Sequence, residues 1–208
     1  MIPLKTSFED LEAWVRSPAR EVTRLTRSTA CEALKAEALR LGASRVFLVR
    51  GSQVVVDERV RLKCLVPLCP NYGRHLLCPP NLPPLDQVER ALRRYERAVI
   101  VIVETEADSE RSGEEAGSLK LHHIVNQLER KALSLGLALS MGLIGGSCRL
   151  CEECVGSFER GPCRHPYEAR PSMEGMGIDV TSILKEVGVQ LHFPPRERVI
   201  WTGMVLLG

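Results

Sequence analysis

The sequence predicts a single α/β domain of three layers, with a mostly buried sheet and helices on both of its faces. Helical and strand patterns alternate along the chain. The run 98–103 is apolar at every position, as expected of a strand covered on both faces. With 208 residues, 44% of them hydrophobic, the chain can bury the core of one domain. We expect this domain over residues 29–208, after a polar, Arg-rich segment over residues 1–28.

The first half of the domain is expected to contain two helices and three strands. Hydrophobic spacing and turn residues predict them in this order: a helix over 29–41 ended by Gly42, strands over 46–49 and 54–56, a cysteine-rich loop over 63–84, a helix over 85–95 and a strand over 98–103.

The second half is expected to repeat the alternation around another cysteine-rich loop. The predicted order is a polar loop over 104–117, a helix over 121–135, a strand over 137–144, a cysteine-rich loop over 148–179, a short helix over 183–187 with Asp179 or Thr181 as its cap, and a final strand from the runs 199–201 and 204–207. Both cysteine-rich loops are expected to leave the sheet at strand ends.

Composition excludes several classes of protein. The 28 Lys and Arg residues against 26 Asp and Glu leave a net charge of +2, which gives no reason to expect nucleic-acid binding. No apolar run approaches the ~18–20 residues of a membrane span. The start of the chain lacks the pattern of a signal peptide. We therefore expect a cytoplasmic protein with neither a membrane nor a nucleic acid as partner.

Eight cysteines stand out against this background. Disulfides do not persist in a reducing cytosol, so clustered cysteines there indicate metal or redox chemistry. Seven lie in the two loops rich in Pro and Gly, and these seven are the candidate metal ligands: Cys64, Cys69, Cys78, Cys148, Cys151, Cys154 and Cys163. The eighth, Cys31, lies on the apolar face of its predicted helix and is interpreted as a core residue.

The second loop carries the sharper motif. Cys148, Cys151 and Cys154 follow the spacing C-x2-C-x2-C, and Cys163 comes nine positions later. Three thiolates at this step can each reach a different iron of one cubane, as in ferredoxin-type runs. Zinc sites more often use two separated pairs. The motif favours a [4Fe–4S] cluster, with zinc, or with plain buried or reactive thiols, as alternatives.

The first loop is less specific by itself. Its spacing is C-x4-C-x8-C, and its three thiolates leave one iron of a cubane without a cysteine. That iron could take Cys163 from the other loop, Cys31, a His or Asp, or an exogenous ligand. The sequence thus predicts one or two clusters, and a single site with ligands from both loops remains open.

Several residues near the cysteines are candidates for supporting roles. Lys63, Arg149 and Arg164 flank the thiolates and could stabilise the negative charge of a reduced cluster. His165 is a candidate ligand or hydrogen-bond donor. His122 and His123 are interpreted as surface residues. Met173, Met176 and Ile178 could shield a cluster as an apolar lid, or pack as an ordinary loop.

The two cysteine loops together resemble a known family. The matching residues are Lys63-Cys64, Cys69, Tyr72-Gly73 and Cys78-Pro79-Pro80, then Cys148-Arg149-Leu150-Cys151 and Cys154, then 162–166 and 170–174. They resemble the cysteine-rich proteins of unknown function described as predicted metal-binding proteins. The resemblance covers roughly residues 30–190, is specific in the loops and implies a metal or iron–sulfur centre. It implies no established reaction.

Three functions compete at this point. The first is an iron–sulfur protein with a redox or electron-transfer role and a redox partner protein. The second is an enzyme whose three-cysteine cluster binds a small-molecule substrate at its open iron, sulfur-containing substrates included. The third is a scaffold stabilised by zinc, without redox chemistry.

Overall fold

The computed structural model describes residues 27–106, 111–192, 195 and 197–208, so the predicted Arg-rich segment over 1–28 lies almost wholly outside the described residues. In chain order the elements are α2 (Arg27–Arg40), β1 (Arg45–Arg50), η2 (Gly51–Gln53), α3 (Glu58–Leu65), α4 (Leu85–Leu92), β2 (Arg97–Glu106), α5 (Arg111–Ser134), β3 (Met141–Leu143), η3 (Phe158–Arg160), α6 (Val180–Glu186) and β4 (Arg198–Leu207).

The four strands form one antiparallel sheet in the order β1-β2-β4-β3. β2 and β4 pair over ten residues each, from Arg97 opposite Leu207 to Glu106 opposite Arg198. β3 is much shorter and pairs only with Met204–Leu206, the far end of β4. Beyond β3, the first half of β4 therefore has no strand on that side among the described residues.

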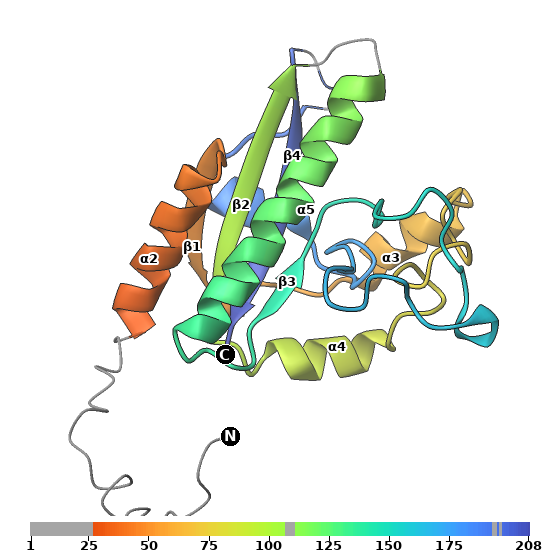
Figure 1. Cartoon of the computed structure of the whole chain (residues 1–208), viewed down its shortest axis with the longest axis horizontal. Coiled ribbons are helices and arrows are strands. Elements are labelled where there is room, and N and C mark those ends of the chain that lie inside the picture. The colour runs from red at the N-terminus through yellow and green to blue at the C-terminus, as the bar shows by residue number, and fades with distance from the viewer. Residues whose placement is uncertain (1–26, 107–110, 193–194, 196) are drawn as a thin grey trace, which may run out of the picture.

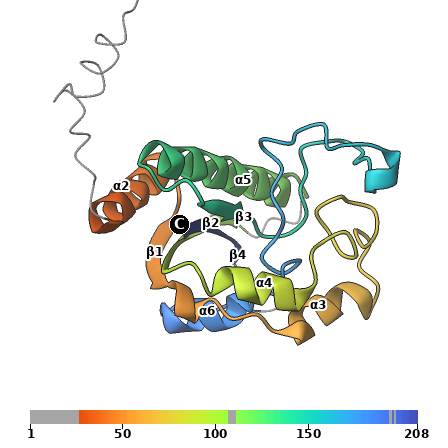
Figure 2. The same ribbon diagram turned by 90° about the horizontal axis from the view of Figure 1, so that it is seen from below.

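Helices cover both faces of this sheet (Figure 2). α2 and α5 pack on one face, where Val101 of β2 belongs to the same hydrophobic core as Leu34 and Leu128. α4, α6 and the segment 173–178 pack on the other, against Ile100 and its alternate neighbours. Successive residues of β2 thus enter opposite cores, which confirms the three-layer α/β prediction and explains the continuous apolar run. None of the described helices combines the length and apolar character that a membrane crossing requires.

Two predicted elements differ from the structure in kind. The run 54–56 makes no strand; Val56 forms a single bridge to Ile178 before Asp57 caps α3. The loop predicted over 104–117 is replaced by the end of β2 and the start of α5, which begins at Arg111. Gly117 lies within that helix, next to Trp201. A Cβ at this position would lie 2.7 Å from the Trp201 side chain, so only glycine allows so close an approach.

The edges of the cysteine loops also differ from the prediction. The first loop leaves α3 rather than a strand, so Lys63 and Cys64 lie in the last turn of a helix. The second loop does leave a strand, but β3 is three residues long instead of the eight predicted over 137–144. Asp179 caps α6, as one of the two predicted alternatives, and accepts a hydrogen bond from the Ser182 amide at 3.1 Å.

Candidate metal centre

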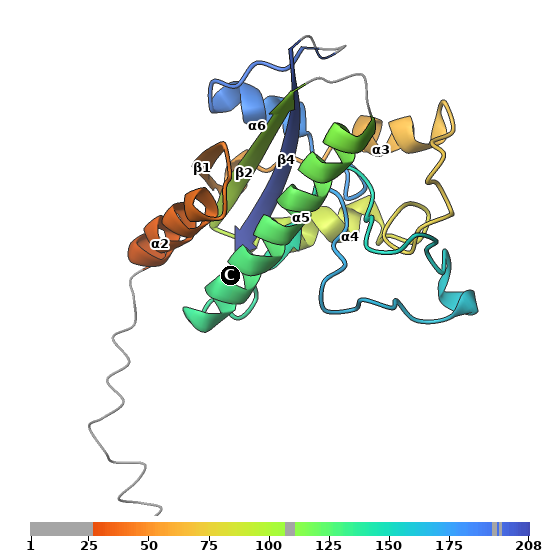
Figure 3. The ribbon, with the colours of Figure 1, turned by 45° about the horizontal axis from the view of Figure 1, so that its top comes forward.

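The two cysteine loops lie side by side at one end of the molecule, beyond α3 and away from α2 (Figures 1 and 3). Two asparagine side chains join them. Asn81 donates from Nδ2 to the carbonyls of Gly156, at 2.9 Å, and of His75, at 3.0 Å. Asn71 donates to Ser147 Oγ at 3.2 Å. These contacts hold the first loop against the residues that carry the second motif.

Gly156 provides a further contact between the loops. Its φ is +82°, in the left-handed region, and a Cβ there would lie 3.2 Å from the Arg74 carbonyl oxygen. Both the conformation and the space favour glycine. The backbones of the two loops can therefore approach closely just after Cys154.

The four cysteines of the second motif surround one small cavity of about 20 Å³. His75, Leu76, Leu77, Leu150, His165 and Ala169 complete its lining. Two backbone amides already serve the thiols: the His165 amide donates to Cys163 Sγ at 3.4 Å, and the Leu150 amide lowers the pKa of Cys148 against the stronger, opposite effect of burial. Amide donors of this kind are the outer-shell hydrogen bonds that stabilise metal-bound thiolates.

The first motif adjoins the second through Cys78. The pKa of Cys78 is raised to about 12, first by burial and then by neighbouring thiols on both sides: Cys69 and Cys64 from its own loop, Cys148 and Cys154 from the other. Burial likewise raises the pKa of Cys64, with Cys69 as the next cause. All eight cysteines are free thiols. The seven predicted ligands therefore form two adjoining groups.

A second, much larger cavity opens beside Cys64 and Cys69. Its volume is about 760 Å³, and it lies along the first half of β4, where β3 has ended. Its walls are largely aliphatic and come from α6 and β4; Lys63, Glu174 and Glu197 are among its charged members. A cavity of this size accommodates a small organic molecule.

Sequence reasoning assigned no role to Glu174 or Arg61, two charged residues next to Cys64. Glu174 lines the large cavity; its Oε2 is buried without a hydrogen-bond partner, and burial raises its pKa. The Arg61 side chain donates to Gly175 O at 2.9 Å and to Pro83 O at 2.8 Å. Glu174 lies within residues 170–174, which contributed to the family resemblance, but its position in the sequence relative to the cysteines did not indicate a metal ligand.

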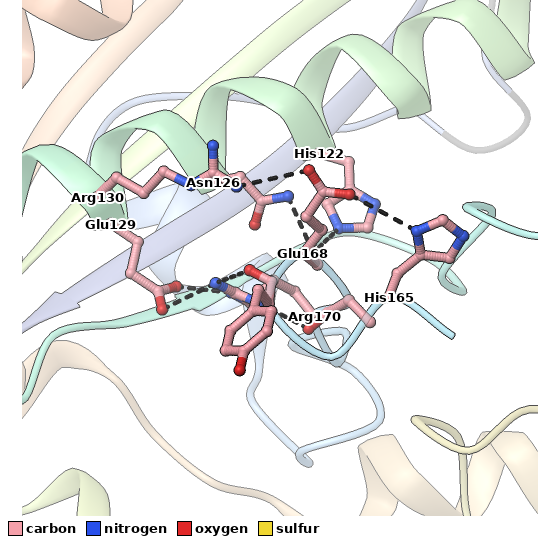
Figure 4. Close-up of polar contacts among 9 residues, drawn as sticks. His122, Asn126, Glu129, Arg130, His165, Glu168 and Arg170 are labelled. Carbon is pink, nitrogen blue, oxygen red and sulfur yellow. Dashed lines mark hydrogen bonds and ion pairs between the residues drawn. The ribbon is translucent and has the colours of Figure 1, made fainter. Parts of the chain in front are cut away.

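The end of the second loop is fastened to α5 by polar contacts (Figure 4). His122 Nε2 and Asn126 Nδ2 both contact the Glu168 carbonyl oxygen, at 2.8 and 2.9 Å. Arg170 pairs with Glu129 of α5 through two hydrogen bonds, of 2.7 and 3.0 Å. The surface prediction for His122 is therefore wrong: the side chain is buried because this loop returns across its helix.

The four predicted supporting residues have different surroundings. His165 lines the four-cysteine cavity, and its Nδ1 lies 3.7 Å from Glu168 Oε2 (Figure 4). Lys63 is exposed at the large cavity. Arg149 lies 3.6 Å from Glu115 of α5, and Arg164 donates to the Glu153 carbonyl at 2.6 Å. The last two thus hold the second loop in place by contacts with other residues.

The proposed apolar lid is part of the core. Met173, Met176 and Ile178 are buried against the sheet face that α4 and α6 cover, which favours the packed-loop alternative. Cys31 is 3% exposed on the other face, among the residues that pack between α2 and α5, as predicted.

The residues present fit a metal centre by their chemistry, because seven thiols in two adjoining groups are ligands for metals that prefer sulfur. Among the described residues, no three Cys, His, Asp or Glu side chains converge closely enough to hold a single ion as they stand. Binding would require the thiols to shift. The segment from Ile144 to Ser157 contains no helix or strand to resist this.

Comparisons with known proteins agree with this chemistry. No curated protein and no solved structure matches the chain. One family model, described as predicted metal-binding protein (DUF2284), matches residues 47–207 and so includes both cysteine loops, the large cavity and the sheet except for the first two residues of β1. By this match over most of its length, the chain belongs to the DUF2284 family of predicted metal-binding proteins.

Proposed function

We propose that this chain is an iron–sulfur protein with a redox role. One [4Fe–4S] cluster would be held by Cys148, Cys151, Cys154 and Cys163, and a second by Cys64, Cys69 and Cys78. The observation that carries the proposal is the cavity lined by all four cysteines of the second motif. Four thiolates satisfy the four irons of a cubane, and such centres carry electrons.

Cluster binding at the second motif requires the small cavity to widen. At about 20 Å³ it is far smaller than a cubane, so the thiols would have to move outward. Gly146 and Gly156, both with positive φ, flank the motif and leave its backbone free of side-chain obstruction. Amides that already point at Cys148 and Cys163 would remain as donors to the bound thiolates.

The position of Cys78 supports electron transfer between the two groups. This thiol lies within electrostatic reach of both motifs, so two clusters would be neighbours. A redox partner would exchange electrons with one of them. Free thiols on eight cysteines are consistent with a cytoplasmic location, where the reducing environment maintains them.

Metal analysis of the anaerobically purified chain tests this proposal. We expect about eight iron and eight sulfide per chain, with absorbance that dithionite bleaches. Cys151→Ser and Cys69→Ser should each lower the iron content, and Cys31→Ser, in the core, serves as the matched control. Zinc without labile sulfide would establish the scaffold alternative instead.

The large cavity favours an enzyme as a second candidate. A cavity of about 760 Å³ beside Cys64 and Cys69 places room for a small substrate where the three-cysteine cluster would lie. When bound, that cluster would supply a Lewis-acidic iron. The aliphatic walls from α6 and β4 would hold the body of the substrate and exclude water.

A small thiol probes this second function. We expect 1-propanethiol to change the EPR spectrum of the reduced protein. Thr181→Trp, which fills the cavity from α6, should weaken the response, whereas Lys185→Trp, exposed on the same helix outside the cavity, should not. A spectrum that the thiol leaves unchanged in the wild-type protein argues against an accessible iron.

A further inference from the structure

We propose that Glu174 is the fourth protein ligand of the cluster at Cys64, Cys69 and Cys78, through its Oε2 atom. This inference rests on the proposed function, because it assumes a cubane at the first motif. It assigns a protein ligand to the one iron of this cubane for which the first motif provides no thiolate.

The position of the Glu174 carboxyl group is the first argument. Glu174 lines the same cavity as Cys64 and Cys69, and its Oε2 is shielded from solvent and accepts no hydrogen bond. A buried carboxylate oxygen without a partner is destabilising, because the hydrogen bonds it made to water are not replaced. A metal ion beside it would remove that destabilisation. Its charge also reaches the Cys64 thiol, where it acts on the pKa in the same direction as Cys69 does.

Two contacts fix the distance between Glu174 and the helix that carries Cys64. Arg61, one turn before Cys64 on α3, donates from Nε to the carbonyl of Gly175 at 2.9 Å. At the start of the same helix, the Asp57 amide donates to Gly177 O at 2.8 Å. The turn that contains Glu174 and the helix that contains Cys64 are therefore positioned together.

The rest of the carboxyl group is already oriented. Burial raises the pKa of this carboxyl group, and the amides of Glu174 itself and of Gly146, with the Ser172 hydroxyl, act in the opposite direction by hydrogen bonding. Ligating carboxylates in proteins are held by such outer donors. Ser172 in turn is fixed because its Oγ accepts a hydrogen bond from the Gly175 amide at 2.9 Å.

The other candidate ligands are less well placed. Asp179 accepts hydrogen bonds from Ser182 as the cap of α6, and Cys31 is buried on the opposite face of the sheet. His75 Nδ1 is also buried without a partner, but this residue lines the cavity of the second motif, where four cysteines already complete a cubane. Glu104, Asp179, His192 and Glu197 share the large cavity with Cys64 and Cys69, but among the carboxylates that line it Glu174 is the one with a buried oxygen that has no hydrogen-bond partner in the described structure.

Ligand substitution in the anaerobically purified full-length chain tests this assignment. An iron held by one carboxylate should leave on mild oxidation more slowly than an iron with no protein ligand, and faster than one held by thiolate. Loss of that iron converts the cluster to a three-iron form with its own EPR signal. The variants are Glu174→Gln, which keeps the shape, and Glu174→Cys, which supplies sulfur. Glu197→Gln is the matched control, since Glu197 is an exposed carboxylate of the same cavity.

We expect Glu174→Gln to form the three-iron signal about tenfold faster than the wild-type protein under ferricyanide, the scale on which even outer partners of a metal site act. Glu174→Cys should form it more slowly, and its Mössbauer spectrum should lose an oxygen-ligated iron that the wild-type protein shows. Glu197→Gln should match the wild-type protein, and far-UV circular dichroism should show that all variants fold.

Two results would overturn the assignment, and they are distinguishable. If Glu174→Gln, Glu174→Cys and the wild-type protein form the three-iron signal at one rate with one Mössbauer spectrum, the cluster exists and Glu174 is not its ligand. If the Cys69→Ser variant contains as much iron as the wild-type protein, no cluster occupies the first motif. The proposed second cluster then fails together with its ligand.

Discussion

Glu129 and Arg170 form an ion pair with two hydrogen bonds between α5 and the second cysteine loop (Figure 4). Their side chains are 23% and 13% exposed, and the Glu129 carboxylate also accepts the amide of Gly142 in β3, at 2.6 Å. One carboxylate therefore joins a helix, a strand and a loop. Removing the Arg170 guanidinium would leave the Glu129 carboxylate partly buried without this cationic partner.

We expect Arg170→Ala to lower the free energy of unfolding by about 2 kcal/mol, since hydrogen bonds to charged groups contribute on this scale. Urea denaturation followed by circular dichroism measures this. Arg130→Ala is the control: its pair with Glu168 is exposed and 3.5 Å long, so a loss below about 0.5 kcal/mol is expected. Equal losses in the two variants would contradict the role given to Glu129.

The buried thiols make the stability of the metal-free chain depend on pH. Burial raises the pKa of Cys64 and Cys148, and that of Cys78 to about 12. The folded state therefore holds these protons more tightly than the unfolded state, whose thiols ionise near about pH 8.5. The resulting stability is complete below that pH and is lost as the pH rises toward 12.

We expect the urea midpoint of the metal-free chain to fall between about pH 8.5 and 10. Cys78→Ala should reduce this dependence, because the thiol with the largest shift is gone. Lysines and tyrosines affect both chains alike, so the comparison isolates Cys78. Identical slopes in the two chains would mean that the Cys78 thiol ionises as it does in the unfolded state.

At the scale of elements, the approach of the two cysteine loops depends on backbone geometry as well as on side chains. Asn71 and Asn81 supply the side-chain contacts, and Gly156 allows the backbone contact with Arg74. Gly161 in the same loop also has a positive φ, of +135°, but has no atom within 4 Å of where its Cβ would be. A comparison of substitutions at Gly156 and Gly161 therefore distinguishes backbone strain within one residue from a steric clash between the two loops.

We expect Gly156→Ala to weaken metal retention more than Gly161→Ala does. Both substitutions strain the backbone by about 1–3 kcal/mol, but only the first also pushes against Arg74. Competition with a chelator, followed by metal analysis, gives the rate of loss for each variant. Equal rates would mean that contact between the loops at Gly156 does not support the centre.

Sequence patterns predicted the elements wherever local spacing determined burial. The apolar run of β2 and the helical spacing of 29–41 produced the correct structure, because each buries a surface that its own residues define. The run 54–56 failed because Val56 meets one residue, Ile178, that lies far along the chain. The helical start of α5 was missed because Gly117 looked like a loop residue, whereas it allows a close approach to Trp201.

For the candidate site, the sequence indicated which thiols to consider, but it did not indicate the residues that surround them. Cysteine spacing identified seven thiols, which the fold brings into two adjoining groups. Asn81, Arg61 and Glu174 gave no such signal, because each acts through a contact between segments distant in sequence. The burial of His122 likewise depends on a carbonyl 46 residues away.

For the whole molecule, most of the proposed cysteine ligands lie outside the two hydrophobic cores, although Leu82 of the first cysteine loop and Met173, Met176 and Ile178 of the second pack in one of them. Each core packs a face of the sheet, and Cys148 is the only proposed ligand that packs against either core among the described residues. The sheet and its helices should therefore fold without metal, whereas the loops should depend on it.

We expect the metal-free chain to keep its helical circular dichroism and a cooperative thermal transition. Trypsin should cut it faster than the metal-bound protein at the exposed Arg149, Arg160 and Arg164. Mass spectrometry of the early fragments locates the cuts. Loss of the cooperative transition on metal removal would show that the cores need the centre in order to fold.

The shortness of β3 leaves the first half of β4 open on one side. A fourth strand that continued alongside β4 for its full length would complete the hydrogen-bond ladder, and in doing so it would occupy the border on which Cys64, Cys69 and Glu174 now face a cavity. Extending this strand by design should therefore yield a sturdier relative without the cavity, so that the missing half of one strand, rather than any added domain, is what leaves this space open.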